Sequence, residues 1–196
     1  MDLYECPAEA PRELEKWFFA AMKTKPADLT AWWNLYWKAM KRGRRPPTKL
    51  RIESDTERGH LTIGAIELIK CALEIEDEFS SELLDAAWAA AGLTRAMKRA
   101  LLERIKSKNF ELDTDCFVAA CICAIVHSVR EALDMVCQLY ALDAGALKPR
   151  SAYKVKCEDF RKMYSLVAEM FDETELAQVR LGVTQVQRHT RVLRRH

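Results

Sequence analysis

Apolar residues recur every three or four positions along most of this chain, and that spacing favours helices throughout. Alternating apolar and polar runs are missing, and so are the Asn-Gly or Asp-Gly turns that join strands into hairpins. We therefore predict an all-α fold of about nine helices in two packed helical subdomains. The predicted domains are residues 1–107 and 108–196, with the hinge at 108–113 or near Gly92.

Residues that start and stop helices set the predicted boundaries. The expected helices cover about residues 11–22, 29–42, 54–73, 81–91, 95–106, 113–127, 128–142, 153–171 and the segment after 172. The third is expected to begin at a capping box, Ser54-Asp55-Thr56-Glu57, and a second box at Ser128 splits the longest apolar stretch. The apolar face of the first helix is predicted to be Leu14, Trp17, Phe18 and Met22.

Several classes of protein are disfavoured. The longest uncharged apolar run, 116–126, is about half of the ~20 residues that a membrane-spanning helix needs. The first residues lack the basic and apolar regions of a secretory signal. Seven cysteines, an odd number, lie mostly within apolar helical pattern, which favours free thiols in a reducing compartment.

No catalytic constellation is visible. The chain has no Gly-rich phosphate loop, no nucleophile elbow and no His-Glu-x-x-His pattern. His127 lies close in sequence to Cys121 and Cys123, but Cys-x-Cys alone is a weak metal signal, and packed thiols explain it better. We expect no enzymatic activity, no metal, no cofactor and no small-molecule substrate.

Charge is segregated although the net charge is only +2. Two basic blocks are candidates for binding a membrane or phosphates, and a mainly acidic stretch, 53–85, lies between them. The candidates are Lys38, Lys41, Arg42, Arg44, Arg45, Lys49 and Arg51 in the first block, and Arg95, Lys98, Arg99, Arg104, Lys106 and Lys108 in the second. The simpler interpretation of any one block is a solvated helix face.

Four aromatic residues cluster beside the first block: Trp32, Trp33, Tyr36 and Trp37. They could form a platform on which bases stack. At helical spacing such clusters are more often core, and we favour that interpretation.

The stretch from 94 to 145 resembles the middle of the orthomyxovirus matrix proteins. A basic helix with Arg95, Lys98, Arg99 and Arg104 precedes a short loop and a very apolar, small-residue helix at 117–126. A helix over 129–143 follows, and Glu57-Arg58-Gly59 upstream also resembles a short motif of that family. Relatives carry a Cys/Cys/His/His cluster after the apolar helix, whereas here only Cys137 stands in that region, so a zinc role is not implied.

The resemblance implies a two-domain helical protein that self-associates into a layer beneath the viral envelope. Its expected partners are other copies of itself, anionic lipid and the viral ribonucleoprotein or RNA, with Arg95, Lys98, Arg99 and Arg104 as contacts. Acidic and basic faces of neighbouring copies would attract each other head to tail. Expected locations are the virion, the host cytoplasm, the inner face of the plasma membrane and the host nucleus.

Two other hypotheses remain open. The same basic blocks could bind RNA phosphates in a nucleoprotein-associated protein without a membrane role. A helical adaptor that docks cellular partners through the aromatic second helix is the third class.

Overall fold

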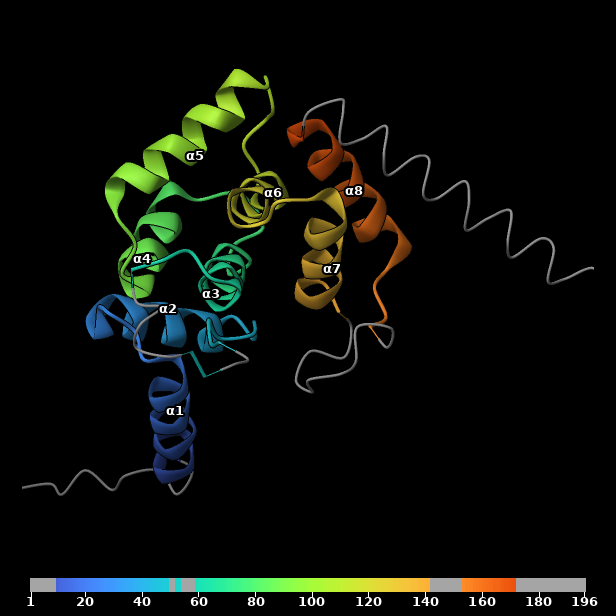
Figure 1. The fold of residues 1–196 in the computed structure, drawn as a ribbon. Coiled ribbons are helices and arrows are strands. Elements are labelled where there is room, and N and C mark those ends of the chain that lie inside the picture. Colours follow the sequence, from blue (N-terminus) through green and yellow to red (C-terminus); the bar gives the residue numbers. More distant parts are fainter. Residues whose placement is uncertain (1–9, 50–51, 54–58, 142–152, 172–196) are drawn as a thin grey trace, which may run out of the picture. The chain divides into compact units, whose positions relative to one another are not determined.

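The computed structural model describes residues 10–49, 52–53, 59–141 and 153–171, and within these ranges the protein is all-helical (Figure 1). The helices are α1 (Ala10–Thr24), α2 (Leu29–Lys41), α3 (Ile63–Leu73), α4 (Ser81–Ala91), α5 (Arg95–Ser107), α6 (Thr114–Ile125), α7 (Val129–Leu139) and α8 (Cys157–Met170). None of them is long and apolar enough to cross a bilayer. The all-α prediction is confirmed, while the proposed helix after residue 172 lies outside the described residues.

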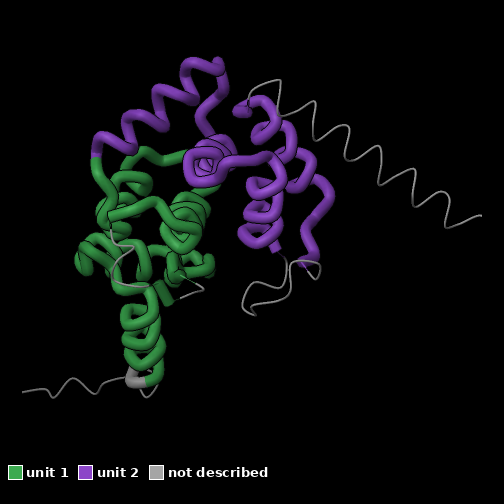
Figure 2. The backbone as a smooth tube through the Cα atoms, viewed as in Figure 1, with its two compact units in different colours: residues 1–94 green, residues 95–196 purple. Residues whose placement is uncertain are grey.

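The chain divides into two compact units, residues 1–94 and 95–196 (Figure 2). The boundary predicted from the sequence lies after residue 107. The difference concerns α5, which packs against α6 and so belongs to the second unit. The short link at Gly92–Thr94 separates the units, in the region that was the alternative hinge.

In the first unit, α2 and α3 each pack against α4. Nearly every side of α3 is buried, which fits a helix that is apolar around its circumference. Trp32 is fully buried, and its indole N–H donates to the carbonyl of Pro47 over 2.7 Å. The interpretation of the aromatic cluster as core is confirmed for Trp32 and Tyr36, whereas Trp33 keeps 38% of its surface exposed.

Side-chain caps begin four of the described helices where the sequence indicated. Asp28, Ser80, Asp113 and Ser128 each accept a hydrogen bond from the backbone N–H three residues later. The start of α3 was predicted wrongly, since the helix begins at Ile63 after a cap by Thr62. The expected capping box at 54–57 lies outside the described residues.

The second unit is organised around α6, which packs against α5, α7 and α8. Its residues from Cys116 to Cys123 are all buried. Burial raises the pKa of Cys116 to about 11 and of Cys123 to about 12, so both thiols stay protonated at neutral pH. They behave as small apolar side chains, as the sequence indicated.

Candidate phosphate-binding surface

The first basic block is largely neutralised by acidic residues of its own unit. Lys38 and Arg42 pair with Glu76 over 2.8 and 3.4 Å. Three further cations of the block follow the same pattern: Arg44 pairs with Asp77 (2.6 Å), Arg45 with Glu67 (2.8 Å) and Lys49 with Glu53 (2.6 Å). The segregated charges of the sequence therefore meet within one copy.

This pairing changes what the block can bind. Five cations (Lys38, Arg42, Arg44, Arg45, Lys49) face four carboxylates (Glu53, Glu67, Glu76, Asp77), so the local charge nearly cancels. Lys41 is exposed and has no ion pair with a described residue, and Arg51 lies outside the described part of the chain. The acidic residues in these pairs are ones that the head-to-tail hypothesis expects to attract basic residues of a neighbouring copy. In the structure they pair with cations of their own copy.

Glu53 has a structural role at the start of α3. Its carboxylate accepts hydrogen bonds from the Lys49 ammonium over 2.6 Å and from the Gly64 backbone N–H over 3.0 Å. Burial alone would raise the pKa of Glu53, but the hydrogen bonds from Lys49 and Thr62 outweigh it and lower that pKa. Glu53 therefore links Lys49 of the first block to the first turn of α3.

Acid should weaken this contact. Because the folded-state pKa of Glu53 lies below its usual value of 4.5, the carboxylate stabilises the fold above pH 4.5, and this contribution disappears as pH falls through the lowered pKa. We expect Glu53→Gln to cost about 1–2 kcal/mol at neutral pH and progressively less in acid. Urea unfolding of both proteins from pH 7 downward measures this, and a constant difference at every pH would contradict the assigned role.

The second basic block presents a free cationic line on α5. Arg95, Arg99 and Lys106 are exposed and have no ion pair with any described residue. At 100° per residue they lie within about 40° of one another around the helix and span about 16 Å along it. Leu101 and Ile105 bury the opposite side. We call Arg95, Arg99 and Lys106 the α5 stripe.

The remaining cations of the second block differ in their surroundings. Lys108 is exposed just beyond α5 and has no ion pair with a described residue. Lys98 is half-buried and already engaged in an interaction. Glu103 is the single acid of α5. The free positive charge of the described basic blocks is thus concentrated on the α5 stripe, with Lys108 and Lys41 in addition.

Arg104 is a structural residue, although the sequence made it a candidate contact. Its guanidinium donates to the carbonyl of Cys123 over 3.4 Å and to that of Met170 over 3.0 Å. These carbonyls lie at the C-terminal ends of α6 and α8, where helix dipoles favour a cation. Arg104 therefore links α5 to the C-terminal ends of α6 and α8.

The α5 helix thus contains exposed arginines, Arg95 and Arg99, and a structural arginine, Arg104. Mutation can distinguish their contributions to binding and to stability. Arg104→Gln should lower the free energy of unfolding by about 1–2 kcal/mol, because two buried carbonyls lose a charged donor. Affinity for phosphatidylserine vesicles should change less than threefold, about 0.6 kcal/mol. Thermal unfolding measures the effect on stability, and vesicle sedimentation measures the effect on affinity. A large loss of affinity without a loss of stability would mean that Arg104 binds the membrane directly.

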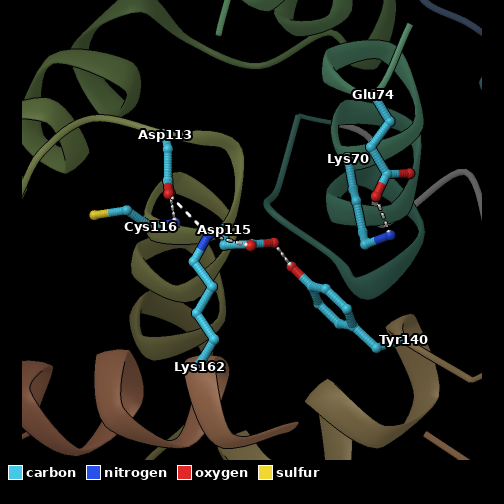
Figure 3. A network of polar contacts seen from close by, with 7 residues as sticks. All are labelled: Lys70, Glu74, Asp113, Asp115, Cys116, Tyr140 and Lys162. Carbon is cyan, nitrogen blue, oxygen red and sulfur yellow. Dashed lines mark hydrogen bonds and ion pairs between the residues drawn. The ribbon is translucent and has the colours of Figure 1, made fainter. Parts of the chain in front are cut away.

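A network of polar contacts joins α6, α7 and α8 in the second unit (Figure 3). Lys162 of α8 bridges Asp113 and Asp115 at the start of α6 over 2.9 and 2.6 Å. The hydroxyl of Tyr140, the C-cap of α7, donates to Asp115 over 2.5 Å. Burial would lower the pKa of Lys162, but the two carboxylates raise it to about 12, so the ammonium stays charged.

No protein-family model matches the chain. Among the described residues, no group of three His, Cys, Asp or Glu side chains is placed to hold a metal ion. The acidic partners of the first block were missed at the sequence level, although the segregation of charge between 38–51 and 53–85 was the available signal. The candidate site is therefore described from the structure alone, as the α5 stripe on the second unit.

Proposed function

We propose that this chain is a non-enzymatic matrix protein of the orthomyxovirus type, which forms a layer beneath the viral envelope and attaches to its anionic lipid. The observation that carries the proposal furthest is the α5 stripe, with three exposed cations free of ion pairs to described residues. The helix is held in its unit by Leu101, Ile105 and Arg104, so the cations stand on a fixed support. Binding therefore has to order the side chains but not the helix that carries them.

The mechanism is multivalent attachment. Each Lys or Arg near an anionic bilayer contributes about 1 kcal/mol, so one copy with three free cations binds weakly. A self-associated layer presents many stripes at high effective concentration, and avidity then holds it to the membrane. The same copies would contact the ribonucleoprotein from the other side of the layer.

The layer would lie in the virion and at the inner face of the host plasma membrane, with copies of the protein in the cytoplasm before assembly. Within that family, we propose a member of the type found in the fish isaviruses. The basic run at 41–45 is a candidate nuclear import signal, although Arg44 and Arg45 are ion-paired in the folded unit.

Vesicle flotation tests the proposal. The protein should float with vesicles containing phosphatidylserine, remain behind with pure phosphatidylcholine, and lose binding as salt rises, because salt screens exposed charges. Equal binding to neutral vesicles would overturn the electrostatic mechanism. Binding to single-stranded RNA with a steep salt dependence, together with no binding to anionic vesicles, would favour the RNA-binding alternative.

A further inference from the structure

The helix α1 is attached to the rest of its unit along one edge. Trp17 packs edge-on against Trp33, with ring centroids 4.6 Å apart, and lies 6.2 Å from the ring of Trp32. Thr24, the last residue of α1, accepts a hydrogen bond from the Lys49 backbone N–H over 3.4 Å. The predicted apolar face of α1 is thus packed only at Trp17. The other large apolar side chains of the helix are about half exposed: Leu14 (49%), Phe18 (55%), Phe19 (62%) and Met22 (59%).

The docked edge of α1 belongs to the core of the unit. Trp32 has no exposed surface and Thr24 keeps only 1%. If α1 left this position, the rings around Trp17 would lose their burial, and a buried indole contributes a large apolar area to stability. The position on α2 therefore needs an α1 helix, but that helix can come from this chain or from a second copy.

The link between α1 and α2 can turn only over a short distance. The N–H of Lys25 donates to the Ala21 carbonyl over 2.8 Å, so Lys25 begins at an end fixed to α1. The N–H of Ala27 donates to the Ala90 carbonyl over 2.8 Å, so Ala27 is fixed to the end of α4. Lys25 and Pro26 therefore form the hinge between the two helices.

The hinge is strained in the arrangement that the structure shows. Lys25 has a φ of +45°, in the left-handed region that is unfavourable for a residue with a Cβ. After α2, α4 and α5 the same region is occupied by Gly43, Gly92 and Asn109, which are residue types that tolerate it. A residue before proline also prefers extended backbone, so Pro26 disfavours this conformation of Lys25 as well.

We propose that two copies of this chain exchange α1, so that Trp17 of each copy packs against Trp33 of the other. The docked contacts are the same in the closed and the exchanged forms, so the hinge decides between them. In the exchanged form Lys25 can adopt extended backbone, which relieves the strain, and short strained hinges favour exchange of this kind. The dimer would carry two α5 stripes, and as the first step toward a membrane-bound layer it rests on the proposed function.

The test compares Lys25→Val with Lys25→Gly in the full-length protein, by analytical ultracentrifugation without lipid. Both substitutions remove the Lys25 side chain, so any contact that it makes is lost equally. Glycine accepts a positive φ without strain, whereas a β-branched residue does not. We expect the dimer of the Lys25→Val protein to have a Kd at least about 30-fold lower than that of Lys25→Gly. A dimer contains two hinges, and the strain in each is worth about fivefold or more.

A control and a direct observation accompany this comparison. Asn109→Val and Asn109→Gly make the same change at a left-handed residue of the second unit, with φ of +56°, and should dimerise equally. A wild-type sample that mixes isotope-labelled and unlabelled copies should show nuclear Overhauser contacts between Trp17 of one copy and Trp33 of the other. The two rings lie close enough for this, at 4.6 Å.

Three results would overturn the inference. They are a wild type that stays monomeric at its highest soluble concentration, equal Kd values for Lys25→Val and Lys25→Gly, and a dimer whose Trp17–Trp33 contacts all lie within one copy. Vesicle flotation tests the proposed function separately. A monomeric wild type that floats with phosphatidylserine vesicles would reject the exchange alone, and an exchanged dimer that ignores them would reject the proposed function alone.

Discussion

Replacing Arg95, Arg99 and Lys106 together with glutamine should weaken binding to phosphatidylserine vesicles about 100-fold. Each cation contributes about 1 kcal/mol near an anionic surface, and every 1.4 kcal/mol is a factor of ten in affinity. All three side chains are exposed and free of described ion pairs, so the substitutions should leave stability nearly unchanged. Sedimentation with vesicles at low salt measures the loss.

The matched control removes the same amount of charge from the first block. Lys38→Gln, Arg42→Gln and Arg44→Gln in one protein lower the net charge equally, but these cations are already paired with Glu76 and Asp77. Their loss should reduce affinity about threefold or less, an effect of overall charge. Equal losses in the two triple variants would mean that net charge alone governs binding and that the α5 stripe has no special role.

Gly92→Ala should destabilise the first unit by about 3 kcal/mol, the largest effect that we expect on stability. Gly92 ends α4 with φ of +71°, which costs an L-residue about 1–2 kcal/mol. A Cβ there would also lie 2.7 Å from the Cβ of Ala27, where the Ala27 N–H is bonded to the Ala90 carbonyl over 2.8 Å. Neither the strain nor the clash can relax without breaking this junction.

Gly43→Ala separates the two contributions. Gly43 also has a positive φ, +65°, but a Cβ at that position would meet nothing within 4 Å. We expect Gly43→Ala to cost about 1–2 kcal/mol, the backbone strain alone. Urea unfolding measures both proteins, and equal losses for the two would show that the Ala27 contact yields without cost.

Helix boundaries were predictable where a side chain caps the backbone. The starts of α2, α4 and α7 are indicated in the sequence by Asp28, Ser80 and Ser128. A short polar side chain before an apolar run can accept a hydrogen bond from the free backbone N–H groups of the first helical turn. The start of α3 was not predictable in this way. Its first turn is also held by Glu53, a residue eleven positions before Gly64, through a contact that only the folded chain provides.

The candidate site was only partly predictable, because sequence shows charge but not its partner. Arg44 and Arg99 look alike in the sequence, yet Arg44 lies 2.6 Å from Asp77, thirty-three residues away, and Arg99 has no such neighbour among the described residues. Arg104 differs from both, since its position on α5 aims it at the ends of α6 and α8. The exposure of Phe18 and Phe19 was equally hidden, because periodicity identifies an apolar face without showing what covers it.

Electron microscopy of the purified protein on vesicles tests the central claim most directly, because it reports attachment and self-assembly together. We predict a continuous protein coat on vesicles containing phosphatidylserine, bare vesicles of phosphatidylcholine, and a coat that the Arg95, Arg99 and Lys106 triple variant fails to form. A protein that stays monomeric and leaves anionic vesicles bare at low ionic strength would contradict the account.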